Sequence, residues 1–122
     1  LALTKVGCRY SQEHRYEEGY YDCSSLVQRC YAEFGINLPS IASTQGQYIV
    51  EHGLEVTEDM LEPGDLIFYS YEANGQFRNI SHVAIYIGNG RMVHAANTAR
   101  GVVNDPFNPS NIGLYGRPSL GQ

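Results

Sequence analysis

The sequence predicts an α+β domain in which helices come first and an antiparallel sheet follows. In the segment "SSLVQRCYAEF" the apolar residues recur at helical spacing. The second half instead contains short apolar runs separated by turn signals, as in antiparallel sheets. Its clearest signal is Asn89–Gly90, which lies between two such runs and predicts a β-hairpin. The length of 122 residues fits one domain, so we expect residues 1–122 to form a single unit.

The first half of the chain is predicted to contain two helices. Cys23 lies three and four residues before the apolar pair Leu26 and Val27, so we expect it in the first turn of the first helix. Gly35 ends that helix, and Pro39 prevents an immediate restart. A second, shorter helix is expected within residues 40–53. The first ten residues predict a weak helix at best.

The second half is predicted to form the sheet. Pro63–Gly64 is a turn signal, and the apolar run at 66–69 is typical of a buried strand. A polar loop at 74–79 separates this run from the rest. The expected strands lie within 81–90, 91–97, 101–105 and 112–118.

Composition and charge exclude several classes of function. The chain is 43% hydrophobic, and its net charge of −5 comes from 8 basic and 13 acidic residues. Because the basic residues form no cluster, we expect neither nucleic-acid binding nor attraction to anionic lipid. We expect no membrane span, because no stretch is long and apolar enough. We expect no leader peptide within these residues, a monomer, and a domain excised from a longer exported protein.

Three cysteines, Cys8, Cys23 and Cys30, cannot all pair with one another. None of them has CxxC spacing, which disfavours a redox dithiol or a zinc ribbon. Cys23 and Cys30 are two helical turns apart, roughly 10 Å, which is too far for a disulfide. A bridge between Cys8 and Cys30 would require tertiary folding, and we expect free thiols instead.

Cys23 is a candidate nucleophile because of its expected place at a helix N-terminus. The helix dipole and an adjacent imidazolium both lower the pKa of a thiol, so we expect a lowered pKa here. His14 and His52 lie in polar surroundings and are expected to be solvated, whereas His82 and His94 lie in neighbouring predicted strands. A bulge near residues 88–91 would change which faces these two side chains occupy. Considered singly, Cys23 could be an inert buried thiol, and His82 a hydrogen-bonded core residue.

Several motifs occur together in an order that resembles a known family. These are "YDCSSLVQRCYAEFGINLP", with Gln45 six positions after the proline, then "EPGDLIFYS" and "SHVAIYIGNGRMVHAAN". In this order they resemble the NlpC/P60 family of papain-like cysteine peptidases, which cut cell-wall peptides. The resemblance extends over roughly residues 5–117, and it implies a papain-like fold with N-terminal helices packed on a central antiparallel sheet.

The resemblance also implies roles for individual residues. Cys23 would be the nucleophile, His82 its base, and His94 the group that orients His82. Asp22 and Ser24 match positions that recognise the free amine of a peptide substrate, although they could merely cap the helix. Tyr10 matches a tyrosine that lines the site and assists the oxyanion, although it could be a core residue. No metal and no cofactor is implied.

The chain departs from the family pattern in the segment before Cys23. The pattern commonly continues with Trp-Gly-Gly after the tyrosine, whereas here "YSQEHRYEEGYYDC" is longer, acidic and without tryptophan. Ser40 also replaces the usual arginine after Leu-Pro. We therefore expect the wall of the cleft formed by this segment, and with it the substrate preference, to differ.

The leading hypothesis is an exported bacterial endopeptidase, secreted or associated with the cell wall. Its substrate would be the peptidoglycan stem peptide, and the bond cut would be that between D-γ-glutamate and the diamino acid. The same site could serve an N-acetylmuramoyl-L-alanine amidase or a cross-link hydrolase. Two other classes remain open: a catalytically silent wall-binding module, and a zinc-binding module using Cys23, His82 and His94.

Overall fold

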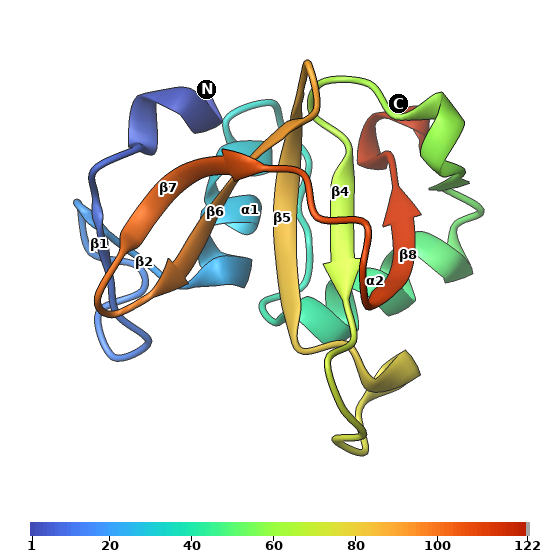
Figure 1. The fold of residues 1–122 in the computed structure, drawn as a ribbon, viewed down its shortest axis with the longest axis horizontal. Coiled ribbons are helices and arrows are strands. Elements are labelled where there is room, and N and C mark those ends of the chain that lie inside the picture. Colours follow the sequence, from blue (N-terminus) through green and yellow to red (C-terminus); the bar gives the residue numbers. More distant parts are fainter. Residues whose placement is uncertain (122) are drawn as a thin grey trace.

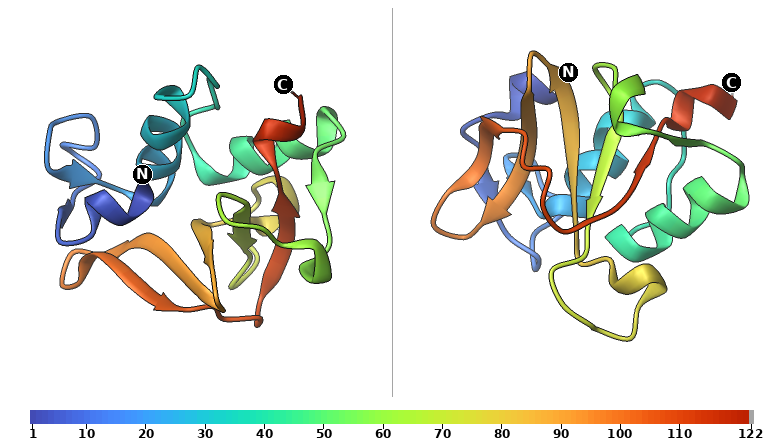
Figure 2. Two further views of the ribbon diagram at one scale, coloured as in Figure 1. Left: turned by 90° about the horizontal axis from the view of Figure 1, so that it is seen from above. Right: turned by 45° about the vertical axis from the view of Figure 1, so that its right-hand side comes forward.

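The computed structural model describes residues 1–121, which form two helices and an antiparallel sheet. The helices α1 (Cys23–Ala32) and α2 (Ala42–Glu51) pack on the same face of the sheet (Figure 1). Viewed from above, in the left panel of Figure 2, the helices form one layer and the curved sheet the other. The predicted α+β class and both predicted helices are thereby confirmed. Gly35, with a φ of 78°, follows α1 and ends it as expected.

The described residues form one six-stranded sheet with the order β3-β8-β4-β5-β6-β7. Each adjacent pair of strands is antiparallel. The strands are β3 (Glu55–Val56), β4 (Leu66–Tyr69), β5 (His82–Gly88), β6 (Arg91–Asn97), β7 (Gly101–Pro106) and β8 (Ile112–Gly116). β3 was not predicted, because a two-residue strand carries no detectable alternation.

The N-terminal segment packs beside the edge of the sheet that is formed by β7. A 3-10 turn at Ala2–Lys5 is the weak helix expected there, and β1 (Arg9–Tyr10) pairs in parallel with β2 (Tyr20–Tyr21). β1 also contacts β6 and β7, so the excursion over residues 11–19 begins and ends close to them (Figure 1). Further 3-10 turns occupy Glu58–Met60, Phe77–Asn79 and Pro118–Gly121.

The core lies mainly between the helices and the sheet. Alternate strand residues point into it, and Gly46 of α2 allows the close approach of the helix. A β-carbon at Gly46 would lie 2.6 Å from Ile80 Cδ1. Fully buried residues of this core include Leu26, Val27, Ile49, Leu66, Phe68, Val83 and Val93. The other face of the sheet carries a smaller cluster of Ile67, Tyr69, Ala84, Met92 and Tyr115.

The predicted hairpin turn at Asn89–Gly90 connects β5 and β6. The φ angles are 54° at Asn89 and 69° at Gly90, as a type I′ turn requires. The register shifts once after the turn: Gly88 pairs with Arg91, but Ile85 pairs with Val93. Without the shift, Ile85 would lie opposite His94. The irregularity therefore moves His94 onto the sheet face that also carries His82.

β5 and β6 diverge beyond the hairpin. The pairing between them stops at Ile85, whereas β6 stays paired with β7 as far as Asn97. Figure 1 shows the two strands separating as they leave the turn. α1 contacts both of them. The start of α1 thereby reaches the half of β5 that is paired with β4 but not with β6.

No helix in the described part of the chain is long and apolar enough to cross a membrane.

Candidate active site

Cys23 is the first residue of α1, and the capping of this helix fixes its position. Asp22 is the N-cap, and its Oδ1 accepts a hydrogen bond of 2.8 Å from the Ser25 backbone N–H. In return the Ser25 hydroxyl accepts from the Asp22 backbone N–H at 2.9 Å. This reciprocal capping box satisfies two donors that a helix start would otherwise leave without partners. The alternative reading of Asp22 as a cap is thus confirmed, while that of Ser24 is wrong, because the cap contacts use Ser25 instead.

The Cys23 sulfur lies against the first residues of β5. The backbone N–H of Val83 donates toward it, as does that of Ser24 at the helix N-terminus. The N–H of Val83 is available because β6 has separated from this part of β5. These contacts place the sulfur beside the strand residue that immediately follows His82.

A chain of polar side chains leads away from His82 across three strands. The Nε2 of His82 lies 2.7 Å from the Nδ1 of His94, and the Nε2 of His94 lies 2.8 Å from the Oδ2 of Asp105. Arg100 donates two hydrogen bonds of 2.7 Å to Asp105. His82 and His94 meet edge to face, with ring centroids 5.0 Å apart. The contact that the sequence left open is therefore formed.

The chemistry of Asp105 sets the direction of the hydrogen bonds in this chain. The bond from Arg100 lowers the pKa of the Asp105 carboxyl far below its usual range, so the group is an ionised acceptor. The Nε2–H of His94 then donates to it, and the tautomer that carries only this proton has an acceptor at Nδ1. His82 accordingly donates from Nε2 and keeps an unprotonated Nδ1. A base nitrogen is thus left on His82 without any further proton transfer.

Burial acts on Cys23 and His82 in the direction that favours uncharged groups. It raises the pKa of the Cys23 thiol to about 11, even though the Val83 and Ser24 N–H groups act against it. Burial, followed by the neighbouring His94, lowers the pKa of His82 to about 3. The expectation of a lowered Cys23 pKa is therefore corrected, because desolvation outweighs the helix N-terminus. The resting pair is a thiol and a neutral imidazole.

Two tyrosines lie close enough to Cys23 for its charge to affect their pKa values. Burial raises the pKa of Tyr10, and the nearby Cys23 and Asp22 raise it further. The pKa of Tyr71 is raised by burial and then by Cys23, and its ring centroid lies 6.3 Å from that of His82. Tyr10 is partly buried and packs against the core, as the alternative reading expected, and it also lies near Cys23. Tyr71 was not predicted, because it stands in a loop without any periodic pattern.

A hollow of about 440 Å³ opens beside Tyr10, and Arg100 also lines it. A larger, more apolar hollow of about 530 Å³ lies near the N-terminus and Cys30. Neither of these two hollows is lined by Cys23, His82 or His94, so neither is assigned to the chemistry.

Asp22 and Ser24 contact an arginine of the preceding segment. Nε of Arg15 forms an ion pair with Oδ2 of Asp22 at 3.0 Å, and its Nη2 donates to the Ser24 hydroxyl at 2.9 Å. The same nitrogen donates to the Ser40 backbone carbonyl. The two residues expected to receive a substrate amine therefore already hold a cation.

Gln45 connects the two helices at the site. Its Nε2 donates to the backbone carbonyls of Ser24 and Pro39, at 2.9 Å each. Gln45 is fully buried, so its contacts hold the first turn of α1 against the start of α2. Sequence reasoning noted this glutamine but did not assign it a contact.

The remaining titratable candidates lie as expected or carry no chemistry. His14 and His52 are exposed, and the three cysteines, all within the described residues, are free thiols. Among residues 1–121, no group of three or more His, Cys, Asp and Glu side chains is arranged to hold a metal ion. Asp105 and Arg100 were missed by sequence reasoning, because their positions depend on the register of β7.

A helix that begins at a cysteine, packed on an antiparallel sheet that carries histidines, is the arrangement of papain-like cysteine peptidases. Residues 8–112 match the NlpC/P60 family. This chain belongs to the NlpC/P60 family, a cysteine peptidase family, as its motifs indicated.

Two curated relatives and one solved structure illustrate the match. The chain is 33% identical over 96 residues to a gamma-D-glutamyl-L-lysine dipeptidyl-peptidase of Bacillus cereus, covering 78% of this chain and 27% of that protein. It is 39% identical over 106 residues to the murein DD-endopeptidase MepS/murein LD-carboxypeptidase of Escherichia coli, covering 83% and 50%. The structure of NlpC1 from Trichomonas vaginalis superposes with a TM-score of 0.81 at 28% identity, covering 96% and 41%. The chain thus spans half or less of the length of these relatives.

Proposed function

We propose that this domain is a cysteine endopeptidase that hydrolyses peptidoglycan stem peptides. Cys23 is the nucleophile, His82 is the general base, and His94 is a positioning residue. The observation that supports this most is the hydrogen-bonded chain from His82 through His94 to Asp105, which begins one residue before Val83, whose backbone N–H faces the Cys23 sulfur. An oriented imidazole near a thiol is the arrangement that nucleophilic catalysis by cysteine requires.

The catalytic cycle follows from the neutral resting pair. As the scissile carbonyl carbon approaches, Nδ1 of His82 takes the thiol proton and the Cys23 sulfur attacks. The resulting imidazolium then gives its proton to the leaving amine, and the C–N bond breaks. His82 next removes a proton from water, which attacks the thioester; the C–S bond breaks, the acid is released, and the imidazolium returns its proton to the Cys23 sulfur. His94 and Asp105 keep the imidazole oriented throughout.

The negative charge on the tetrahedral intermediate requires hydrogen-bond donors. The backbone N–H of Cys23 at the helix N-terminus is one, and the Tyr10 hydroxyl is the other. The raised pKa of Tyr10 keeps its hydroxyl protonated at neutral pH, so it remains a donor. Tyr71, half exposed beside His82, forms part of the wall that the substrate meets.

The bond that we propose is the one between D-γ-glutamate and the diamino acid. The name of the Bacillus cereus relative specifies this linkage. The Escherichia coli relative is named as a DD-endopeptidase, which supports cleavage of a cross-link as the second candidate. Either activity requires contact with the cell wall, so we place the domain outside the cytoplasmic membrane, secreted or wall-associated, within a longer protein.

Digestion of purified muropeptides, followed by mass spectrometry, tests the proposal. We expect wild type to release fragments cut after D-glutamate, Cys23→Ala to be inactive, and the control Cys8→Ala to retain activity. Activity that survives in Cys23→Ala would refute the assignment of the nucleophile. Peptides released whole from the glycan would indicate an amidase, and an inert wild type would indicate a silent module.

A further inference from the structure

Arg15 fills a cation site directly beside the nucleophile. Three oxygens surround its guanidinium: the Asp22 carboxylate, the Ser24 hydroxyl and the Ser40 carbonyl. The site is largely enclosed, because the side chain of Arg15 is 18% exposed and that of Asp22 is 11% exposed. Asp22 directly precedes Cys23, and a cation held here is near enough to affect the pKa of the Cys23 thiol.

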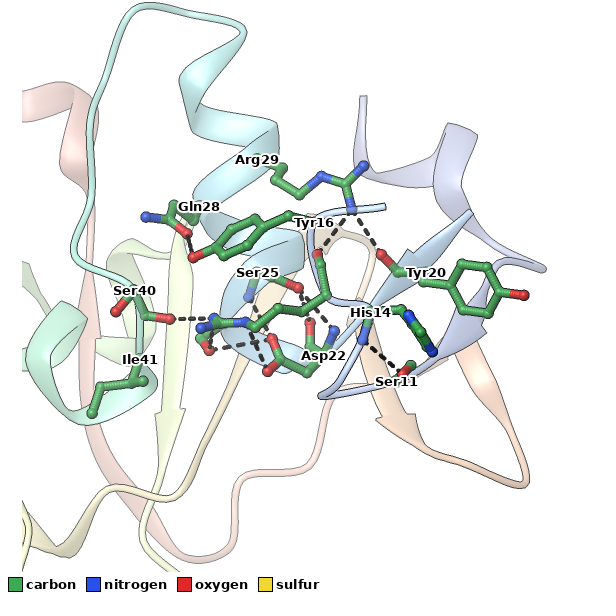
Figure 3. A network of polar contacts seen from close by, with 12 residues as sticks. Ser11, His14, Tyr16, Tyr20, Asp22, Ser25, Gln28, Arg29, Ser40 and Ile41 are labelled. Carbon is green, nitrogen blue, oxygen red and sulfur yellow. Dashed lines mark hydrogen bonds and ion pairs between the residues drawn. The ribbon is translucent and has the colours of Figure 1, made fainter. Parts of the chain in front are cut away.

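The segment that carries Arg15 is fixed to α1. Arg29 of α1 donates to three of its backbone carbonyls, those of Arg15, Glu17 and Tyr20, at 3.1, 3.2 and 2.7 Å. The Tyr16 hydroxyl donates to the Gln28 side chain at 2.6 Å. Figure 3 shows Tyr16 reaching Gln28, and Ser40 approaching from the side opposite Tyr20. Arg15 is therefore held by the fold and is not a free surface side chain.

The charge of Arg15 reaches the reactive groups. The thiol pKa of Cys23 is raised chiefly by burial, and Arg15 is among the groups that lower it. Arg15 acts in the same direction on the pKa of Tyr10, which burial raises. A second cation brought to this place by a substrate would therefore meet a positive charge already present.

The donor requirements of this site are those of a substrate ammonium. A carboxylate, a hydroxyl and a carbonyl are all acceptors, so they can bind either a primary ammonium or a guanidinium. With Arg15 in place, the Asp22 charge is neutralised, and a free α-amine would be left without a counter-ion while being desolvated. An acylated, uncharged nitrogen does not carry this cost.

We propose, building on the function above, that Arg15 is a specificity-determining residue. It occupies the cation site formed by Asp22, Ser24 and Ser40, so the domain selects stem peptides whose amino end is acylated. In the cell wall these are the peptides still attached to glycan. Peptides with a free α-amine, such as those already released from the sugar, are discriminated against.

A single peptide in three forms tests this proposal. The forms are the intact muropeptide, the same peptide released from the sugar with a free α-amine, and that released peptide after N-acetylation. We expect wild-type kcat/KM for both acylated forms to exceed that for the free amine by about tenfold or more, the least expected from like charges brought together. Arg15→Ala should reduce this ratio at least tenfold, mainly by hydrolysing the free amine faster. Acetylation separates the effect of charge from contacts with the sugar.

Control variants keep the inference falsifiable. Arg15→Lys retains a cation and should keep the wild-type ratio, whereas Arg15→Gln should lower it even if Arg15→Ala does not fold. Arg78→Ala removes a distant exposed ion pair with Glu55 and should leave the ratio unchanged. A wild type that prefers the free amine, or a ratio unmoved by Arg15→Gln and Arg15→Ala, overturns the inference. If the wild type cuts none of the three forms, the proposed function itself fails.

Discussion

Two arginine–aspartate pairs flank the candidate nucleophile, and they differ in what they contact. Arg15–Asp22 lies before α1 and is enclosed, with side chains 18% and 11% exposed. Arg100–Asp105 lies on and before β7, with side chains 49% and 19% exposed. In the first pair the two side chains contact each other, and the arginine also donates to the Ser24 hydroxyl. The second turns one carboxylate oxygen towards His94.

The difference shows that the same ion pair can position a base or occupy a subsite. In Arg100–Asp105 the arginine lowers the pKa of the carboxyl, and the carboxylate accepts the hydrogen bond that fixes the tautomer of His94. In Arg15–Asp22 one carboxylate oxygen accepts the hydrogen bond of the helix cap, and the arginine pairs with the other oxygen and neutralises the charge. We therefore expect changes at β7 to lower the rate of hydrolysis, and changes before α1 to alter specificity and stability.

The largest expected effect comes from removing the base on which the Arg100–Asp105 pair acts. We expect His82→Ala to lower kcat by about 10²–10⁴-fold, the usual contribution of general acid–base catalysis. Muropeptide hydrolysis with matched circular dichroism spectra would measure this loss. A variant that retains more than a tenth of the wild-type kcat would exclude His82 as the base.

The pH dependence of thiol alkylation tests whether the resting pair is neutral. Because burial raises the pKa of Cys23 to about 11, the thiolate fraction below that pH falls about tenfold with each unit of acidification. Iodoacetamide should thus react with Cys23 about 100-fold more slowly at pH 7 than at pH 9. Subtracting the Cys23→Ala rate removes the signal of the other cysteines. A rate that stays level between pH 5 and 7 would instead show a preformed ion pair.

Asp105→Asn tests the orienting role of the exposed pair. The amide cannot act as the charged acceptor, so His94 and His82 lose their fixed tautomers, and we expect kcat to fall about 10–100-fold, as for other residues that orient a ligand or base. KM should change little, which a purely structural defect would not predict. An unchanged kcat would contradict the role of Asp105.

Arg100→Ala is the milder companion variant. Loss of the Arg100 guanidinium raises the pKa of Asp105 toward the ordinary value, but the carboxylate remains ionised at pH 7. The ionised, active form is present above the Asp105 pKa and is lost as pH falls through it. The decline of kcat on acidification should therefore begin at a higher pH than in the wild type, with a smaller effect at pH 7 than that of Asp105→Asn.

The smallest expected effect, on stability, separates the two pairs again. Asp22→Asn keeps an oxygen for the helix cap but leaves Arg15 enclosed without a counter-ion, so we expect the free energy of unfolding to fall by about 1–3 kcal/mol. Asp105→Asn, at an exposed pair, should cost at most about 1 kcal/mol. Urea unfolding measures both. The cost of Asp22→Asn should shrink in an Arg15→Ala background, and an undiminished cost would show that Arg15 is not its cause.

Local features of the fold and the site were predictable because they depend on neighbouring residues. The helix from Cys23, its end at Gly35 and the Asn89–Gly90 turn follow from spacing and backbone preferences. The contact of His82 with His94 was not predictable, because a one-residue register shift between Tyr86 and Gly88 decides it. A slip of one residue reverses every side chain of a strand, and composition does not reveal it.

The sequence by itself determined the α+β class and the family, and it named the residues proposed to carry the chemistry. Only the tertiary structure decided the protonation state of Cys23, the roles of Asp105 and Arg100, and the occupant of the site beside Asp22. These depend on burial and on contacts between segments far apart in the chain. A pKa is set by the surroundings that folding creates, and the spacing of residues along the sequence carries little record of them.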